Sequence, residues 1–98
     1  MPAYVINDMI GSEPAPFEEY KRLAPEEVVR FGGRYLVSGG HSEKLEGDWT
    51  PRRLVILEFP SLDQARAWID SPDYAPARQL RMRSTVSNPV VVECVDPG

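Results

Sequence analysis

The sequence predicts an α+β fold, with one four-stranded antiparallel sheet and helices on one of its faces. Runs rich in β-branched and aromatic residues favour strands, and they occur at residues 3–10, 34–38, 52–59 and 88–95. Segments with apolar residues at spacings of three and four favour amphipathic helices, and they follow the first and third of these runs. The order is therefore βαββαβ, the ferredoxin-like arrangement, whose first and third strands lie side by side in the middle of the sheet.

The first helix is predicted over residues 16–24. Its apolar side chains share one face: Phe17, Tyr20, Leu23 and Ala24. Pro25 has no amide hydrogen to donate, so we expect the helix to bend or split there, with a second short turn over residues 26–31. Gly32 or Gly33 then supplies the left-handed residue that ends the helix.

A long hairpin is expected between the second and third strands. Gly39 and Gly40 follow the second strand directly, and Gly47 and Pro51 precede the third. The paired glycines do not form a phosphate-binding loop, because neither the dinucleotide spacing nor a Gly-Lys-Ser/Thr run is present. Turn geometry accounts for them instead.

Two helical segments are predicted after the third strand. Ser61 and Gln64 have the spacing of a capping box, in which both side chains satisfy amides at a helix N-terminus. The apolar stripe of this helix consists of Leu62, Ala65, Trp68 and Ile69. A serine followed by a proline repeats the start signal for a third segment over residues 71–84, although Pro76 disfavours its early part. One face of that segment carries Tyr74, Ala77 and Arg81.

The composition predicts a single soluble domain over residues 1–98. The chain is 42% hydrophobic and has a net charge of -4, which excludes the basic footprint of a protein that binds duplex nucleic acid or an anionic membrane. It has one cysteine and therefore no intramolecular disulfide, and it shows neither a signal-peptide pattern nor a long apolar span. We therefore expect a cytoplasmic protein.

The third strand is apolar on both faces. Leu54 and Ile56 lie on one face, and Val55, Leu57 and Phe59 lie on the other. The helices can cover only one face of the sheet, so the other needs a partner, and a second copy of the chain is the simplest one. The sequence thus predicts a homodimer that packs sheet against sheet.

Three motifs carry a resemblance that covers nearly the whole chain, from Tyr4 to Glu93. They are GGRYLVSGG, then LEGDW-P-R-LVILEFPS, then A-AW-DSPDY-AR-LR. The sequence resembles the family named domain of unknown function 1330 (DUF1330), within the dimeric α+β barrel superfamily. The resemblance implies a barrel-like dimer of ferredoxin-like protomers, and little chemistry, because the family has no settled activity. Superfamily relatives include cofactor-independent monooxygenases, lactone isomerases and haem-binding enzymes with substrate cavities between sheet and helices, but a shared scaffold does not fix function.

Two residues are candidates for catalysis. His41 is the only histidine and therefore the default general acid or base near neutral pH, although its polar neighbours are typical of a solvated loop. Glu58 shares a face with apolar strand residues and would be costly to bury unpaired. Arg34 lies opposite it if the second and third strands pair. Such a pair could face a ligand or could only fix the strand register.

The remaining candidates are ligand-binding residues. Trp49 with an arginine such as Arg53 could form a wall for a planar, anionic or aromatic molecule. Equally, Glu46 and Arg53 could staple the hairpin. Tyr74 and Arg78 lie on the edge of the last helix with Arg81, where the arginines could receive a carboxylate ligand or pair with the acidic first helix.

The sequence does not predict a metal, because its potential metal ligands are scattered. It does not predict an organic cofactor either. The function we expect is a homodimer that binds a small organic or anionic molecule between sheet and helices; whether it also transforms that molecule without a cofactor stays open. The competing hypothesis is a non-catalytic structural or ligand-binding dimer. A remote alternative is a tautomerase that uses the amine of Pro2 after removal of Met1, although tautomerases have a different strand order.

Overall fold

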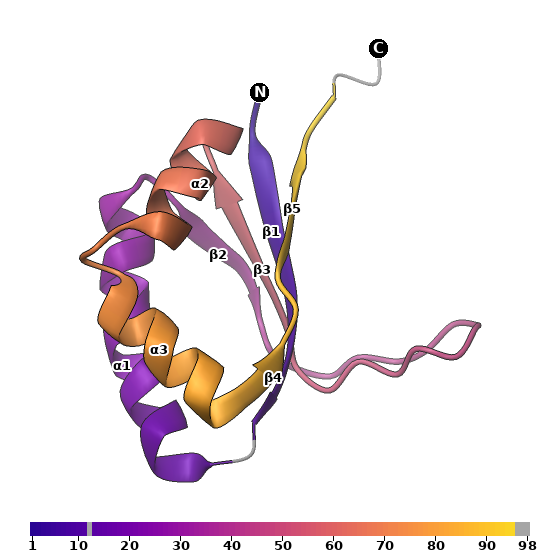
Figure 1. The fold of residues 1–98 in the computed structure, drawn as a ribbon. Coiled ribbons are helices and arrows are strands. Elements are labelled where there is room, and N and C mark those ends of the chain that lie inside the picture. The colour runs from indigo at the N-terminus through magenta and orange to yellow at the C-terminus, as the bar shows by residue number, and fades with distance from the viewer. Residues whose placement is uncertain (12, 96–98) are drawn as a thin grey trace.

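The computed structural model describes residues 1–11 and 13–95. Along the chain, its elements are β1 (Ala3–Gly11), α1 (Pro14–Arg30), β2 (Arg34–Ser38), β3 (Leu54–Phe59), α2 (Leu62–Asp70), α3 (Ala75–Ser84), β4 (Thr85–Ser87) and β5 (Val90–Glu93). The strands form one antiparallel sheet in the order β2-β3-β1, and β4 and β5 both pair with the other side of β1. All three helices cover the same face of this sheet (Figure 1). The predicted ferredoxin-like arrangement is thereby confirmed.

The predicted fourth strand is two short strands. β4 pairs Ser87 with Met9, and β5 pairs Val90 with Ile6 in the same register, so the two occupy one position in the sheet. Residues 88 and 89 separate them, where the Asn88 amide donates to the Asn7 side-chain oxygen over 3.1 Å. The prediction placed the start of this strand too late, because α3 passes directly into β4 at residue 85.

Of the two outcomes expected at Pro25, a bend or a split, the split is wrong, since α1 runs through Pro25 as one helix. A proline at this position removes only one helical hydrogen bond, the one to the Lys21 carbonyl. The helix buries Tyr20, Ala24 and Val28 against the rest of the protein, and this packing outweighs the lost bond. Its end is as predicted: Gly32 has a φ of +82°, which is the left-handed conformation that glycine adopts readily.

Of the two predicted serine caps, one is confirmed and one is wrong. Ser61 caps α2 as expected, since its side chain accepts from the Gln64 amide over 3.1 Å. Ser71 does not cap α3: its side chain accepts from the Asp73 amide in a separate turn, and the helix begins at Ala75. Pro76 therefore sits in the first turn of α3, where a missing amide hydrogen costs nothing.

The core lies between the sheet and the helices. Its centre is aromatic: the ring of Trp68 lies 5.3 Å from that of Phe59 and 4.6 Å from that of Tyr74, centroid to centroid. Gly33 packs so closely on this core that a Cβ atom there would lie 2.6 Å from the Phe59 ring and 2.9 Å from Val28. The close approach joins the end of α1 to the end of β3.

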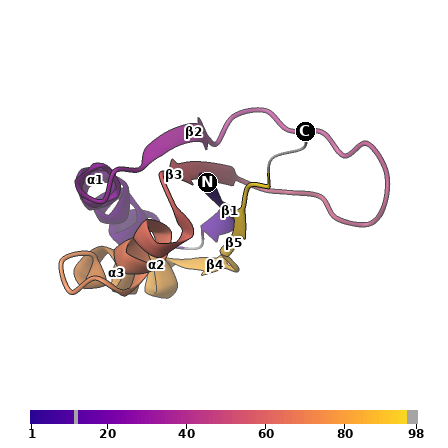
Figure 2. The same ribbon diagram turned by 90° about the horizontal axis from the view of Figure 1, so that it is seen from above.

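Residues 39–53, which we call the arm, leave the sheet on the side opposite to the helices (Figures 1 and 2). Residues 40–50 of the arm are exposed throughout. Leu45, near its tip, retains 96% of its accessible surface, and Trp49 retains 59%. The arm therefore buries little of its apolar surface within its own chain.

Candidate functional site

A cavity of about 180 Å³ lies between α1 and the sheet. Met9 on β1, Val55 on β3 and Tyr35 and Ser38 on β2 form its sheet side. Tyr20, Lys21, Ala24 and Pro25 line it from α1, and Arg53 closes it at the base of the arm. The cavity thus combines apolar walls with a few polar groups, as small-molecule sites commonly do.

An irregularity in β2 brings two of these residues to the cavity. Tyr35 pairs with Leu57 and Ser38 pairs with Val55, so both face the helices, although they are three positions apart. Strict alternation would place them on opposite faces of the sheet. The register shifts between Tyr35 and Val37, which is the signature of a β-bulge.

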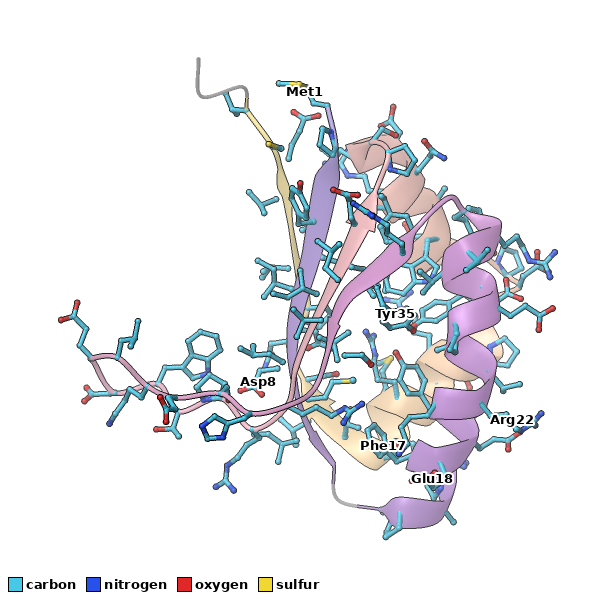
Figure 3. The ribbon with its side chains drawn as sticks, turned by 180° about the vertical axis from the view of Figure 1, so that it is seen from behind. Met1, Asp8, Phe17, Glu18, Arg22 and Tyr35 are labelled. Carbon is cyan, nitrogen blue, oxygen red and sulfur yellow. The ribbon has the colours of Figure 1, made fainter. Side chains whose placement is uncertain are left out.

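Tyrosine hydroxyls gather under α1. Tyr20 and Tyr74 lie 3.3 Å apart, oxygen to oxygen, and are hydrogen-bonded. Burial raises the pKa of Tyr35, and burial followed by the neighbouring Tyr20 raises the pKa of Tyr74. A tyrosine hydroxyl is protonated at neutral pH even at its usual pKa, so both can donate hydrogen bonds. Figure 3 shows Tyr35 between the sheet and α1.

Arg53 is the cation at the arm end of the cavity. Among residues 1–11 and 13–95, its buried Nε has no hydrogen-bond partner, and its Nη2 donates only a long bond, 3.5 Å, to the Ser38 carbonyl. Gly39 makes room for the guanidinium, because a Cβ atom there would lie 2.7 Å from Nη1. Gly39 thus has a role beyond turn geometry.

Asp8 fixes the base of the arm from the other side of the sheet. Its carboxylate accepts hydrogen bonds from the amides of Arg52 and Arg53, at 2.9 and 3.0 Å, and from the Trp49 indole at 3.2 Å. These amides are why β3 begins at Leu54 and not at Arg52 as predicted. Partial burial raises the pKa of Asp8, but the three hydrogen bonds outweigh it, so the pKa is lowered. Figure 3 shows Asp8 beside the arm, across the sheet from Tyr35.

Replacing Asp8 with alanine should lower the free energy of unfolding by about 1–2 kcal/mol at pH 7, since hydrogen bonds to a charged group are lost. A lowered pKa means that the carboxylate stabilises the fold above the pKa of the unfolded chain, near 4, and that this contribution disappears as the pH falls through the folded-state pKa. Urea unfolding at several pH values checks this. A difference between the two proteins that stays constant down to about pH 2 would contradict it.

Glu58 lies on the face of the sheet away from the helices. Arg34 pairs with it in the predicted register, and the Arg34 Nε donates to its carboxylate over 2.7 Å. Tyr4, opposite Glu58 on β1, also donates to it. The bonds from Arg34 and then Tyr4 lower the pKa of Glu58, and partial burial opposes them. The expected ion pair is confirmed, and it points away from the cavity.

The structure separates most of the other predicted site residues from the cavity. His41 is exposed in the arm and lies 3.1 Å from Glu43. Glu46 is exposed in the same arm, and among the described residues it forms no ion pair with Arg53. Arg78 donates to the Ile69 carbonyl and lies 3.7 Å from Asp70. Only Arg53 lines the cavity, and Tyr74 reaches it through Tyr20.

Trp49 lines a different hollow. A groove of about 410 Å³ runs over the outer face of the sheet, with Asp8 and Trp49 on one side and Val86 and Val90 on the other. No arginine lines this groove, so the predicted wall of tryptophan and arginine is not assembled here. Pro2, the residue of the tautomerase alternative, does not line the cavity either. Its carbonyl accepts a hydrogen bond from the Cys94 amide over 2.8 Å.

Tyr20, Lys21 and Tyr35 were not among the residues singled out from the sequence. Tyr20 was assigned to the core because it lies on the apolar stripe of the helix. Tyr35 was assigned to a strand between two glycine pairs. The available signal was that both are aromatic residues with a polar end, which rarely lie inside a protein without a partner.

A larger hollow, of about 700 Å³, lies along α3. Residues 75–83 of that one helix supply all its lining, including Met82 and Arg83. A groove lined by a single helix cannot enclose a molecule from two sides. The cavity beneath α1 is therefore the better candidate site despite its smaller volume.

In the described residues, no group of three or more His, Cys, Asp or Glu side chains is arranged to hold a metal ion. No helix in residues 1–11 and 13–95 is both long and apolar enough to cross a bilayer.

Comparisons with solved structures place the fold. A protein of unknown function from Rhodopseudomonas palustris is 22% identical, with a TM-score of 0.75 over 98% of this chain and 84% of its own. A dimeric ferredoxin-like protein of unknown function from Jannaschia sp. CCS1 is 12% identical, with a TM-score of 0.69 over 96% and 100%. A variant of SnoaB, a cofactor-independent oxygenase from Streptomyces nogalater, is 16% identical, with a TM-score of 0.58 over 97% and 94%. At these identities the likeness shows the fold alone.

No curated protein matches the chain significantly. A family model does: the one described as domain of unknown function (DUF1330) matches residues 2–95. That span includes every helix and strand of the structure. The chain therefore belongs to the DUF1330 family.

Proposed function

We propose that the protein is a homodimer that binds a small organic molecule in the cavity beneath α1. The cavity carries this proposal, because it is walled by the sheet on one side and a helix on the other. Its polar lining comes from three parts of the chain: Arg53 at the base of the arm, Tyr20 on α1 and Tyr35 on β2. Convergence of polar groups on a largely apolar pocket is the usual mark of a ligand site.

The dimer is supported by the outer face of the sheet. Ile6 and Ile56 pair across β1 and β3 on this face, and Val90 pairs with Ile6 from β5. More than half of the surface of Val86, Val90 and Val92 is exposed, and apolar strand residues grouped in this way mark an interaction surface. The similar proteins from Jannaschia sp. CCS1 and Thermobifida fusca are described as dimeric, which supports the same assembly here.

The similarity to SnoaB means that this chain shares a scaffold on which cofactor-independent oxygenation occurs. The similarity does not extend to the reaction of SnoaB. His41 and Glu58 do not face the cavity, so neither is placed to act on a molecule bound there. The polar side chains that line the cavity, from Arg53, Lys21, Ser38 and two tyrosines, are suited to binding and orienting a molecule. Ligand binding is thus better supported than catalysis, and a cytoplasmic location stays a prediction.

Thermal-shift screening of the full chain with aromatic acids, lactones and quinones should find compounds that raise the melting temperature. A ligand at a hundred times its Kd adds about 2.7 kcal/mol to stability, which corresponds to a rise of roughly 10–20 °C for a chain of this length. Ala24→Leu fills the cavity and should abolish the rise, because Ala24 is buried in its wall.

Ala67→Leu is the matched control, since it adds the same atoms to an exposed position on α2. It should leave the ligand-induced rise unchanged. A rise that persists in Ala24→Leu would show that the compound binds elsewhere, for example along α3. A panel without any stabilising compound would contradict the proposed function itself.

A further inference from the structure

The lining of the cavity contains positive charge and no carboxylate. Lys21 and Arg53 both line it, and no Asp or Glu does. The two cations flank one ring, since the Lys21 Nζ lies 5.1 Å and the Arg53 Cζ 5.8 Å from the centroid of Phe17. Lys21 is neutralised by Glu18 at 2.7 Å. Arg53 forms no ion pair within residues 1–11 and 13–95.

Arg53 also has hydrogen-bond donors to spare. In the described part of the chain its buried Nε has no acceptor, and its one side-chain hydrogen bond, to the Ser38 carbonyl, is long at 3.5 Å. Buried N–H groups normally find acceptors. A guanidinium presents parallel N–H donors that match the two oxygens of a carboxylate. An anionic acceptor from outside the chain would neutralise the guanidinium and accept the hydrogen bond from its Nε.

The protein holds this guanidinium in place from two directions. The Asp8 carboxylate accepts from the backbone amide of Arg53 over 3.0 Å and so fixes where its side chain starts. Gly39 leaves the space that the Nη1 end occupies. A charged group positioned by two separate residues, yet left without a counter-ion, is arranged as a binding site is arranged.

The size and the walls of the cavity limit which molecule can carry that acceptor. About 180 Å³ is slightly more than the cavity of roughly 150 Å³ that accommodates benzene in an engineered protein. Tyr20 and Tyr35 supply aromatic surface, and Met9 and Val55 supply aliphatic surface. The space therefore suits one ring or a short carbon chain bearing a single acidic group.

We propose that this cavity binds a small organic acid, whose carboxylate or enolate oxygens accept hydrogen bonds from Arg53 while its ring or chain packs against Tyr20 and Tyr35. The inference rests on the proposed function and names the ligand class for the same cavity. The Tyr35 hydroxyl, on a residue that also lines the cavity, is a further donor for an oxygen of the ligand.

Matched pairs of an acid and its amide test the charge of the ligand directly. Benzoate with benzamide, and butanoate with butanamide, differ little in shape but differ in charge. Isothermal titration of the full chain at pH 7 should show each acid binding at least about tenfold more tightly than its amide. Inorganic phosphate, as a third probe, should bind more weakly than benzoate, because it cannot use the apolar walls.

Variants at Arg53 locate the effect. Arg53→Met keeps an unbranched apolar stem and removes the guanidinium charge, so it should abolish the preference for acid over amide. Arg53→Lys keeps the charge but loses the paired donors, so it should keep only part of the preference. Arg52→Met is the matched control, because Arg52 is exposed and does not line the cavity, and it should behave as the unmodified protein.

A second pair of variants leaves Arg53 in the chain, in case its replacement prevents folding. Gly39 and Gly40 have φ angles of +80° and +105°, so alanine is strained at both positions. Only at Gly39 would the new Cβ displace the guanidinium, since nothing lies within 4 Å at Gly40. Gly39→Ala should therefore weaken benzoate binding about tenfold or more, whereas Gly40→Ala should not.

The outcomes separate this inference from the proposed function. Amides that bind as tightly as their acids, or phosphate that binds as tightly as benzoate, would overturn the organic acid and leave the cavity as a ligand site. The organic acid would also be overturned if no acid binds up to about 10 mM, while lactones or quinones bind and Ala24→Leu abolishes their binding. Absence of binding by every compound in both experiments would overturn the inference and the proposed function together.

Discussion

Phe59→Ala should lower the free energy of unfolding by about 3–5 kcal/mol, the range for removal of a buried aromatic ring. Phe59 has no exposed surface, and its ring contacts Trp68 and the close-packed Gly33. Because Gly33 contributes no side chain, the void cannot be refilled from that direction. A small domain is stable by about 5–15 kcal/mol, so the variant should lose a large part of its stability.

Urea unfolding followed by circular dichroism measures this loss. Met82→Ala is the control, because Met82 is 62% exposed on α3 and its removal should change stability by less than about 0.5 kcal/mol. A loss below about 1.5 kcal/mol for Phe59→Ala would show that the helices collapse onto the vacated space. That result would contradict the rigid packing described for the ends of α1 and β3.

Val90→Glu should dissociate the proposed dimer. Val90 lies in the groove of the outer face and is 59% exposed in the single chain, so a carboxylate there costs the protomer little. In a symmetric dimer that packs outer face on outer face, two such charges enter one apolar interface, where unpaired or like charges cost several kcal/mol. We expect the dimer Kd to rise about a hundredfold or more, measured by analytical ultracentrifugation.

Val29→Glu makes the same replacement on the exposed side of α1, where Val29 is 66% exposed. This variant should remain a dimer with an unchanged Kd. Dissociation by both variants would point to a general effect of added charge. A dimer that is unaffected by Val90→Glu would place the interface on another surface, and a dilute monomer in the unmodified protein would contradict the dimer altogether.

Most of the fold could be predicted because its signals are periodic or local. Residues alternate between buried and half-buried along β1 and β3, and α2 buries one stripe. Each pattern shows in the sequence as a hydrophobic period of its own. The cap of α2 at Ser61 and the stop at Gly32 depend on residues next to each other in the chain. Such features need no knowledge of distant contacts.

The errors arose where distant contacts decide the structure. Pro25 does not end α1, because packing of the helix on the sheet compensates for one missing hydrogen bond. β3 starts at Leu54, because Asp8, which is far away in sequence, takes the amides of Arg52 and Arg53. The bulge in β2 has no local mark, yet it turns Ser38 from the expected outer side to the cavity.

The candidate site shows the same division. The Arg34–Glu58 pair followed from strand register alone, and the structure contains it. A cavity between sheet and helices was expected, but its lining could not be, because it comes from α1, three strands and the arm, whose relative positions depend on the whole fold. Arg53 was selected for its neighbour Trp49, whereas its environment in the structure is set by Gly39, Ser38 and Phe17.

Both edges of the sheet are interrupted. The β2 edge carries the bulge between Tyr35 and Val37. The opposite edge is broken at residues 88 and 89, between β4 and β5. Pro89 has no amide hydrogen to donate there. Such interruptions discourage a further strand from adding to an edge, the route by which sheets grow into fibres. The proposed pairing through the outer face would have no such continuation, because each copy would cover the outer sheet face of the other. If the proposed dimer forms, its assembly would therefore stop at two copies.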